Sequence, residues 1–360
     1  MHYHYPMSTN LNIIMPYLNP NLVSINNISY IQNFAKLLPS FSPAGFECHL
    51  GACHSKQVGF HFKIPCISWK LSNDLIANPS WQIIQDFCHE WFKQHSNFYS
   101  NIDNVIVELD INENSSQIPF PCVFVAIKKR NTKDNTQNLI KIVYRLFSYK
   151  VSSRVISKFE HCIDCLLNMS KGEITHIGVM LARKDKTIRI NVGNIKLDQF
   201  LKYLNLIGWS KSQKNLLPLL NEVTQFVDYI IFSLDIDENV YPRIGLECFF
   251  KKQPKYEPRW KKLLNFLIQK KLCTELEKDG LLSWPGIVQK ESASDIWPKH
   301  LFITDTFFYH RALSLFWRKI NHIKLVCNEK SIIEAKGYLS FGHKWIDTTK
   351  LTNSHLTINR

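Results

Sequence analysis

The sequence has no long apolar run and no familiar nucleotide-binding or hydrolase motif. No stretch of about 18 or more apolar residues occurs, so no membrane-spanning helix is expected. The first residues, with His2, Tyr3, His4 and Pro6, have neither a charged leader with an apolar stretch nor a small-residue cleavage pattern. A glycine-rich phosphate loop, a nucleophile elbow and kinase signatures are also missing. We therefore expect a soluble, cytoplasmic protein without membrane insertion.

The ten cysteines do not form the compact framework of a disulfide-rich protein. They are scattered along predicted strands and helices, as expected of reduced thiols that pack as small apolar side chains. With 360 residues, 45% hydrophobic and 12% aromatic, the chain is long enough to bury a large core. The composition thus allows one sizeable globular domain.

What the sequence contains is a five-fold repeat of two strands and a helix. Each unit has an extended apolar/polar alternation, a turn and a second alternation, usually followed by an amphipathic helical run. The predicted strand pairs are Phe46–Leu50 with Val58–Ile64, Val105–Ile111 with Cys122–Lys128, Ile174–Arg183 with Thr187–Val192, Tyr229–Ile236 with Arg243–Phe250, and His322–Cys327 with Ile333–Phe341. Helical spacing follows the first four pairs, at 81–92, 139–147, 200–207 and 263–268.

Five such ββα repeats predict an α+β fold, a ten-stranded antiparallel β-barrel with a polar lumen, surrounded by α-helices. Closing the barrel would remove exposed sheet edges, and helices with one apolar stripe would cover the apolar face of the wall. The predicted organisation is an N-terminal segment with a helix (1–43), a single barrel domain (44–345) with an insertion (274–320), and a C-terminal tail (346–360).

The polar face of the predicted strands is charged, and the fold would place it inside the barrel. The strand at 174–183 is the exception, because His176, Gly178, Met180 and Ala182 make up this face. Side chains alternate across a strand, so residues of one parity share a face. In the last strand, Lys336 and Tyr338 alternate with Gly337 and Leu339. The polar residues assigned to the lumen in this way are Glu47, His49, His61, Lys63, Glu108, Asp110, Arg189, Asn191, Asp235, Arg243, Glu247, Lys324, Lys336 and Tyr338.

This pattern resembles the ABBA-fold (PT-barrel) prenyltransferases, most of all the peptide-modifying branch of the cyanobactin type. The resemblance covers residues 44–345, and Lys336-Gly337-Tyr338 is similar to the Lys-x-Tyr pairs that hold a prenyl diphosphate in that family. It implies an acidic catalytic role for Glu47 or Glu108. It also implies diphosphate binding by Lys63, Arg189, Arg243, Lys324, Lys336 and Tyr338. The sequence departs from the family in its long insertion and in lacking a repeated Arg-x-Lys pair.

The resemblance implies transfer of an isoprenyl group from a prenyl diphosphate to a peptide side chain or a small aromatic acceptor inside the lumen. Cations and tyrosine hydroxyls would neutralise the departing diphosphate, rings such as Phe249 would shield the carbocation, and a carboxylate would accept the acceptor's proton. No tightly bound cofactor is expected. Mg²⁺ is a candidate companion of the prenyl diphosphate, and Asp235 and Asp237 are the candidate ligands for such an ion.

The charged lumen is also compatible with three alternatives. Its acids and cations could simply pair with one another across a solvated interior. A non-catalytic barrel that binds a peptide or lipid as a biosynthetic partner protein would have the same shape. The net charge of +14 also admits a nucleic-acid-binding protein. That third class is disfavoured because the cations lie opposite acids and no nucleic-acid-binding motif is found.

Overall fold

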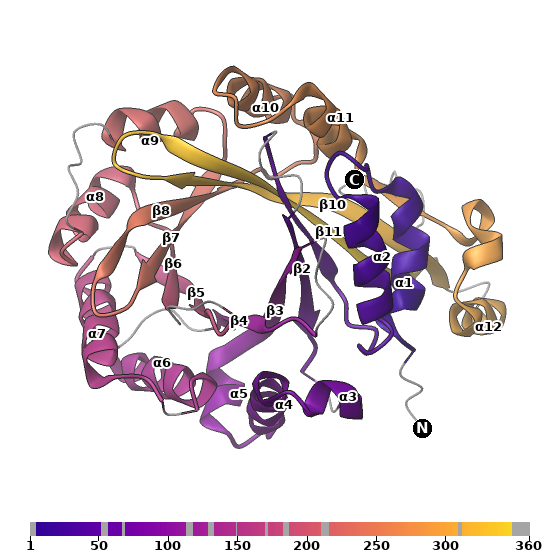
Figure 1. Ribbon diagram of the computed structural model, residues 1–360, viewed down its shortest axis with the longest axis horizontal. Helices are drawn as coiled ribbons and strands as arrows, with labels where there is room; N and C mark the ends of the chain where they lie inside the picture. Colours follow the sequence, from indigo (N-terminus) through magenta and orange to yellow (C-terminus); the bar gives the residue numbers. More distant parts are fainter. Residues whose placement is uncertain are drawn as a thin grey trace.

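The computed structural model shows a closed antiparallel β-barrel surrounded by helices (Figure 1). It describes residues 5–51, 57–66, 69–112, 118–128, 133–148, 150–169, 172–182, 187–209, 216–308 and 312–347. Within these residues eleven strands form one sheet, in the order β11-β1-β2-β3-β4-β5-β6-β7-β8-β10-β9, and β10 also pairs with β11. The second pairing closes the wall, so ten strands make the barrel and β9 is added outside it. The predicted barrel is confirmed.

All five predicted hairpins are present, and every strand is antiparallel to its neighbours. They are β1 (Ala44–His49) with β2 (Gln57–Ile64), β3 (Ile102–Asn112) with β4 (Pro121–Ile127), β5 (Glu173–Val179) with β6 (Ile188–Gly193), β7 (Tyr229–Ile236) with β8 (Val240–Phe249), and β10 (Ala312–Cys327) with β11 (Ile332–Asp347). The last hairpin is longer than predicted, because β10 and β11 pair with each other along their whole length. On its other side, β10 pairs with β8 at residues 323–327 and with the short strand β9 (Gly286–Val288) at residues 316–318.

Helices lie on the outside of the wall, most of them in the connections between hairpins (Figure 1). The described helices are α1 (Met7–Ile14), η1 (Met15–Tyr17), α2 (Ile25–Phe34), α3 (Asn73–Ile76), α4 (Pro79–Trp91), α5 (Asn97–Asn101), α6 (Lys133–Leu146), α7 (Ser153–Leu167), α8 (Leu197–Leu206), α9 (Leu216–Thr224), η2 (Pro254–Tyr256), α10 (Arg259–Gln269), α11 (Glu275–Ser283), η3 (Lys290–Ser292), η4 (Ser294–Ile296) and α12 (Lys299–Phe308). The four predicted helical runs correspond to α4, α6, α8 and α10. None of the described helices has the length and apolar character that a membrane span requires.

The main core lies between the outer face of the wall and the helices. Strand residues of one parity, such as Phe60 and Phe62, are fully buried there. Phe62 stacks on Trp81 of α4 with ring centroids 6.4 Å apart. Burial of each such side chain contributes roughly 1.5–3 kcal/mol, so this layer supplies most of the driving force for folding.

Glycines in the wall make room for large side chains on the lumen face. A Cβ at position 45 would lie 2.6 Å from Nε2 of His61, and a Cβ at position 59 would lie 2.8 Å from Cβ of Glu47. Both are closer than real Cβ contacts allow. Gly45 and Gly59 therefore let the polar side chains of the neighbouring strands lie against the wall.

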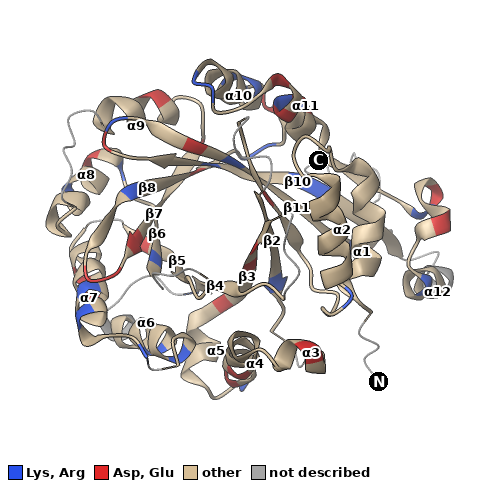
Figure 2. Cartoon of the chain, in the orientation of Figure 1, with Lys and Arg blue, Asp and Glu red and all other residues tan. Residues whose placement is uncertain are grey.

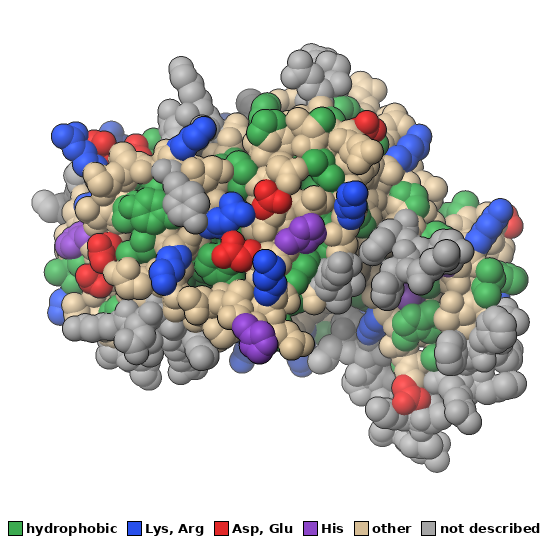
Figure 3. Space-filling model, turned by 90° about the horizontal axis from the view of Figure 1, so that it is seen from below, with side chains coloured by type: hydrophobic (Ala, Val, Ile, Leu, Met, Phe, Trp, Pro, Cys, Tyr) green, Lys and Arg blue, Asp and Glu red, His purple; other side chains and the backbone are tan. Residues whose placement is uncertain are grey.

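Charged residues occur on the strands of the wall as well as on the outer helices (Figure 2). On the face seen from below, basic, acidic and apolar side chains are intermixed (Figure 3). The net positive charge of the chain is therefore not gathered into one continuous basic surface on that face.

Candidate functional site

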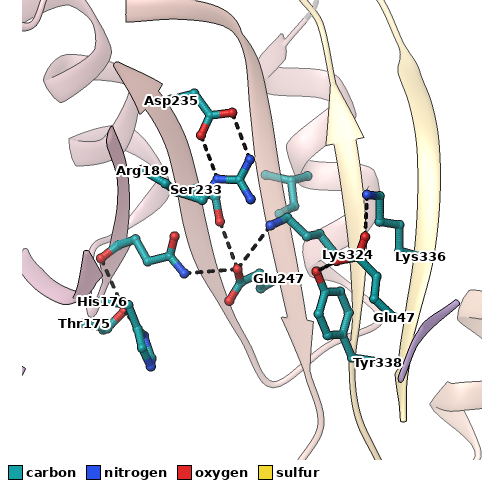
Figure 4. Close-up of polar contacts among 12 residues, drawn as sticks. Glu47, Thr175, His176, Arg189, Ser233, Asp235, Glu247, Lys324, Lys336 and Tyr338 are labelled. Atoms are coloured by element: carbon teal, nitrogen blue, oxygen red, sulfur yellow. Dashed lines mark hydrogen bonds and ion pairs between the residues drawn. The ribbon is translucent and has the colours of Figure 1, made fainter. Parts of the chain in front are cut away.

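Glu47 of β1 lies at the centre of a polar cluster on the seam where the barrel closes (Figure 4). Its carboxylate accepts hydrogen bonds from Lys336, at 2.6 Å, and from the hydroxyl of Tyr338, both on β11. Nε2 of His49 is 3.3 Å from the same carboxylate, and Nδ1 of His49 is 2.9 Å from Glu334. Glu47 and Tyr338 meet because the antiparallel register places them directly opposite one another.

Glu47 is buried but held in its ionised form. Burial raises the pKa of a carboxyl, and here the positive charges of Lys336, His49 and Lys324 outweigh it, so that the pKa of Glu47 lies well below its ordinary value. The pKa of Lys336 is raised: burial works against its charge, but Glu47 and then Glu334 favour it. Glu47 is thus an anchored anion and not a free base.

A second cluster lies on β6, β7, β8 and β10 (Figure 4). Glu247 accepts hydrogen bonds from Ser233 at 2.9 Å and Asn191 at 3.1 Å, and Nζ of Lys324 is 3.5 Å away. Arg189 donates two hydrogen bonds to Asp235, which stands opposite it in register, at 2.7 and 2.9 Å.

Three cations of these clusters, Lys324, Lys336 and Arg189, are here called the inner cations, and each has a carboxylate partner. Lys336 is paired with Glu47, Lys324 with Glu247, and Arg189 with Asp235. This agrees with the alternative in which acids and cations pair across the interior. An added anion would have to compete with these carboxylates for the inner cations, or bind together with a cation of its own.

Glu108 of β3 differs from Glu47. Its side chain is buried, and it forms no hydrogen bond or ion pair with any of the described residues. Burial, followed by the negative charges of Glu47 and Asp110, raises the pKa of Glu108 to about 7, although Lys324 and Arg189 act in the opposite direction. Two carboxyls of one lumen with pKa values displaced in opposite directions are a common arrangement in acid–base catalysis. Glu108 is the one that can take up and release a proton near neutral pH.

An apolar cluster, here called the apolar wall, lines the side of the lumen formed by β3, β4 and β5. It is separate from the main core and contains Cys122, Phe124 and Met180, with Ile106 and Ala182 packed against them. In the order of strands around the barrel, β4 and β5 lie farthest from β10 and β11. Lys324, Lys336 and Tyr338, here called the cationic wall, therefore face the apolar wall across the lumen. The uncharged face of the predicted strand at 174–183 was the signal for it in the sequence.

A pocket of about 470 Å³ lies where β3, β4 and β5 join the outer helices. Asn104, Ala126 and His176 line it and stand opposite one another in register, on the same face of the sheet as Phe124. Part of the lining of this pocket therefore belongs to the same face of the wall as the apolar wall. Another pocket, of about 810 Å³, lies outside the barrel between α4 and α6, where Arg145 pairs with Glu90.

The remaining predicted site residues are distributed along the wall. His49 and Asn191 are buried, His61, Lys63 and Asp110 are partly exposed, and Arg243 is exposed near the start of β8. Parity predicts which face of a strand a side chain lies on, but not how far inside the barrel it lies. Arg243 is exposed and is therefore not one of the inner cations.

The candidate metal ligands are engaged by other groups of the protein. Asp235 is bound to Arg189, and Oδ1 of Asp237 accepts the backbone N–H of Asn239 at 2.7 Å. Within the described residues no group of three or more His, Cys, Asp or Glu is placed to hold a metal ion. A metal ion would therefore have to arrive with a ligand that supplies most of its donors.

His322 was not among the predicted site residues. It stacks on Tyr338 with ring centroids 4.2 Å apart, and Phe249 lies 4.8 Å from it on the other neighbouring strand. Tyr229 extends this stack, 4.8 Å from Phe249. The expectation that Phe249 and Tyr338 contribute rings to the lumen face agrees with this arrangement.

Comparison with known proteins gives a likeness of fold. No family model and no curated protein matches the chain. Among solved structures, the crystal structure of AnaPT from Neosartorya fischeri is similar to it, with a TM-score of 0.46 and 10% sequence identity. The match covers 94% of this chain and 92% of that chain.

Proposed function

We propose that the protein is a prenyltransferase that moves an isoprenyl group from a prenyl diphosphate to an aromatic or peptide side-chain acceptor inside the barrel. The observation that carries the proposal is the division of the lumen. The cationic wall suits the diphosphate, the apolar wall suits the isoprenyl chain, and Glu108 has a pKa suited to accepting a proton.

In this proposal the C–O bond between the isoprenyl carbon and the diphosphate breaks, and its electron pair leaves with the diphosphate. Lys324, Lys336 and Tyr338 stabilise the negative charge that develops there. The allylic cation is attacked by the electron-rich acceptor, which forms the new bond and becomes acidic. Glu108 accepts the proton that the acceptor loses, and the surrounding rings keep water from the cation.

The charge balance of the lumen indicates the form in which the donor binds. Because each inner cation is already paired with a carboxylate, the lumen offers little surplus positive charge to a diphosphate. The donor should therefore enter as its magnesium complex, in which the metal ion neutralises part of the charge. Pyrophosphate release is expected to require Mg²⁺ and to stop when EDTA is added.

The test is incubation of the protein with dimethylallyl, geranyl or farnesyl diphosphate and an acceptor peptide containing aromatic residues. Released pyrophosphate and a mass increase of the peptide are measured. Lys324→Gln should lower kcat/KM by about 100-fold, the effect of removing one charged donor from a developing anion. Lys319→Gln, on the same strand but exposed to solvent, is the matched control and should remain active.

A non-catalytic barrel that binds a peptide or lipid is the second candidate. The pairing of all three inner cations favours it, because a lumen that is electrically satisfied without a ligand needs no diphosphate. It predicts that no prenyl diphosphate releases pyrophosphate, with or without Mg²⁺, while peptide or lipid still binds.

A further inference from the structure

The excess positive charge of the chain is concentrated in one stretch of its surface. Residues 251–271, which follow β8 and run through η2 and α10, contain eight basic residues and one acid, a net charge of +7. This is half of the net charge of +14 carried by all 360 residues. Seven lysines of the stretch are exposed and are here called the lysine surface: Lys251, Lys252, Lys255, Lys261, Lys262, Lys270 and Lys271.

Contacts within this stretch hold the lysine surface on one side of the protein. Nε1 of Trp260, in the first turn of α10, donates a hydrogen bond to the backbone oxygen of Lys252 at 2.8 Å, and its ring stacks on Phe250. The lysines that follow β8 therefore lie beside the start of α10. This helix lies on the outside of the barrel, at the top of Figure 1 and so away from the face that Figure 3 shows, and it carries basic residues in Figure 2. The lysine surface thus extends along α10, over about 16 Å.

α10 has a basic outer face and an apolar inner face. Its apolar side chains, among them Trp260 and Leu264, are fully buried against the protein. Its exposed face, which contains no acid, covers about 100° of the helix and is formed by Lys261, Lys262, Asn265 and Gln269. Because its apolar side is buried in the core, α10 can meet a partner through its charges but has no apolar face to insert into one.

Acidic side chains that pack beside the lysine surface are already bound to an arginine. Arg259 donates hydrogen bonds to Asp228 at 2.8 Å and to Glu257 at 2.9 Å. Lys270 lies 3.5 Å from Glu222, in an exposed pair of the kind that contributes little to stability. No ion pair is found for the other six lysines within the part of the chain that the structure describes. Their positive charge is therefore available to a partner.

Lys261 and Lys262 stand where a cation does not help the fold. They lie in the first turn of α10, at the end of the helix that carries the partial positive charge of its dipole, and no acid occurs in this turn. Lys270 and Lys271, at the other end of the helix, suit the dipole. The two lysines of the first turn are therefore better explained by an anionic partner outside the chain than by the stability of α10.

We propose that the lysine surface holds the protein on a bilayer that contains anionic phospholipids. Clusters of about four to eight basic residues are typical of segments that bind such headgroups. The outer side of α10 is a ridge, which can lie along a plane, whereas a peptide needs a groove, and the pockets of about 470 and 810 Å³ lie elsewhere on the protein. This inference goes beyond the proposed function and does not depend on it.

The residue types favour a membrane over a nucleic acid. The exposed cations are all lysines, which act as point charges towards a diffuse negative surface, whereas arginine is preferred for paired contacts with single phosphates and bases. The one arginine of the stretch, Arg259, is held by Asp228 and Glu257. Tyr256 is 50% exposed, and Nζ of Lys255 lies 5.4 Å from its ring centroid. An exposed tyrosine among lysines is typical of the membrane–water interface.

Sedimentation of the whole protein with lipid vesicles tests the proposal. Vesicles of phosphatidylcholine with about 30% phosphatidylglycerol should bind the protein at about 0.1 M NaCl and release it at about 0.5 M, because salt screens the attraction. Vesicles of phosphatidylcholine alone should not bind it.

Two lysines of α10 provide the decisive variant. Lys261→Gln/Lys262→Gln should weaken binding to the anionic vesicles about 25-fold, since each lysine near such a surface strengthens binding about fivefold. The urea midpoint of this variant should equal or exceed that of the wild type, because the first turn of α10 loses two unfavourable charges. Lys141→Gln/Lys202→Gln is the matched control. It removes the same charge from exposed positions on α6 and α8 and should bind within about threefold of the wild type.

If the first double variant does not fold, acetylation of wild-type lysines by acetic anhydride, read by mass spectrometry, decides. Anionic vesicles should protect Lys261 and Lys262 but not Lys141 or Lys202. The proposal is overturned by no binding to anionic vesicles, by equal binding to neutral ones, by equal losses in the two double variants, or by lysines of α10 that stay unprotected. Tighter binding of an oligothymidylate or of an oligoglutamate peptide, lost in Lys261→Gln/Lys262→Gln, would also overturn it and assign the lysine surface to that partner.

Discussion

Replacing Glu108 with glutamine should change how the stability of the protein depends on pH. Glu108 is buried beside other carboxylates, and its pKa in the folded protein is about 7, against an ordinary value of 4.5. Glutamine has nearly the same shape but does not titrate. The substitution therefore removes one ionisation and leaves the packing of the lumen almost unchanged.

The magnitude and sign of this change in the free energy of unfolding follow from the shift in the pKa of Glu108. The folded protein binds the Glu108 proton more tightly than the unfolded chain does, so the stabilisation is complete below about pH 4.5 and is lost as pH rises through 7. The difference of 7 minus 4.5 pKa units corresponds to about 3 kcal/mol. The advantage of Glu108→Gln over the wild type should accordingly grow by about 2–3 kcal/mol between pH 5 and pH 8.

Urea unfolding at pH 5, 6, 7 and 8 measures this difference. His61 and His322 act in the other direction: their folded pKa values lie below the ordinary 6.5, so their contribution is present above that pH and is lost as pH falls toward 4. Only the difference between variant and wild type isolates Glu108. Glu291→Gln, at an exposed position, is the control and should follow the wild type. A Glu108→Gln advantage that stays constant with pH would refute the reasoning.

Three further substitutions probe the lumen. Lys336→Met leaves Glu47 buried without its main cation and should lower the free energy of unfolding, measured with urea, by about 3–5 kcal/mol. Adding Glu47→Gln in a double variant should restore most of this loss, whereas additive losses would contradict the pairing. Gly245→Ala places a methyl group 3.0 Å from Cε of Lys324 and should weaken binding of magnesium pyrophosphate about tenfold by calorimetry, so unchanged affinity would argue against Lys324 as a ligand. Phe124→Ala should raise kcat/KM for geranyl over dimethylallyl diphosphate about tenfold, and an unchanged ratio would remove the isoprenyl chain from the apolar wall.

The barrel could be predicted because a period of two is a strong signal when ten segments share it. Alternation fixes which residues face helices and which face the lumen, and strand pairing within hairpins is local. The extent of the last hairpin was not predictable in the same way. Residues 316–318 pair with β9 in place of β8 while residues 312–320 stay paired with β11, so the burial that sets their pattern differs from that of the other strands.

The lumen residues could also be predicted from parity, whereas their partners and ionisation could not. Lys336 meets Glu47 only through the register between the first and last strands of the wall. Glu47 and Glu108 belong to the same residue type and the same lumen, yet the pKa of one is lowered and that of the other is raised. That difference depends on which charges stand nearby. His322 shares the parity of Lys324, but alternation alone does not show that its two ring nitrogens lack hydrogen-bond partners among the described residues.

The closure of the wall between β1 and β11 has a consequence for how the newly synthesised chain folds. Lys336 and Tyr338 are separated from Glu47 by 289 and 291 positions along the chain. Nearly every strand must therefore be synthesised before this ion pair can form. Contacts between residues so far apart in the sequence form late and slowly during folding. Until then the first strand carries an unmatched edge that invites aggregation. Pairing of β1 with β11 should therefore complete the lumen and remove the aggregation-prone edge in the same step.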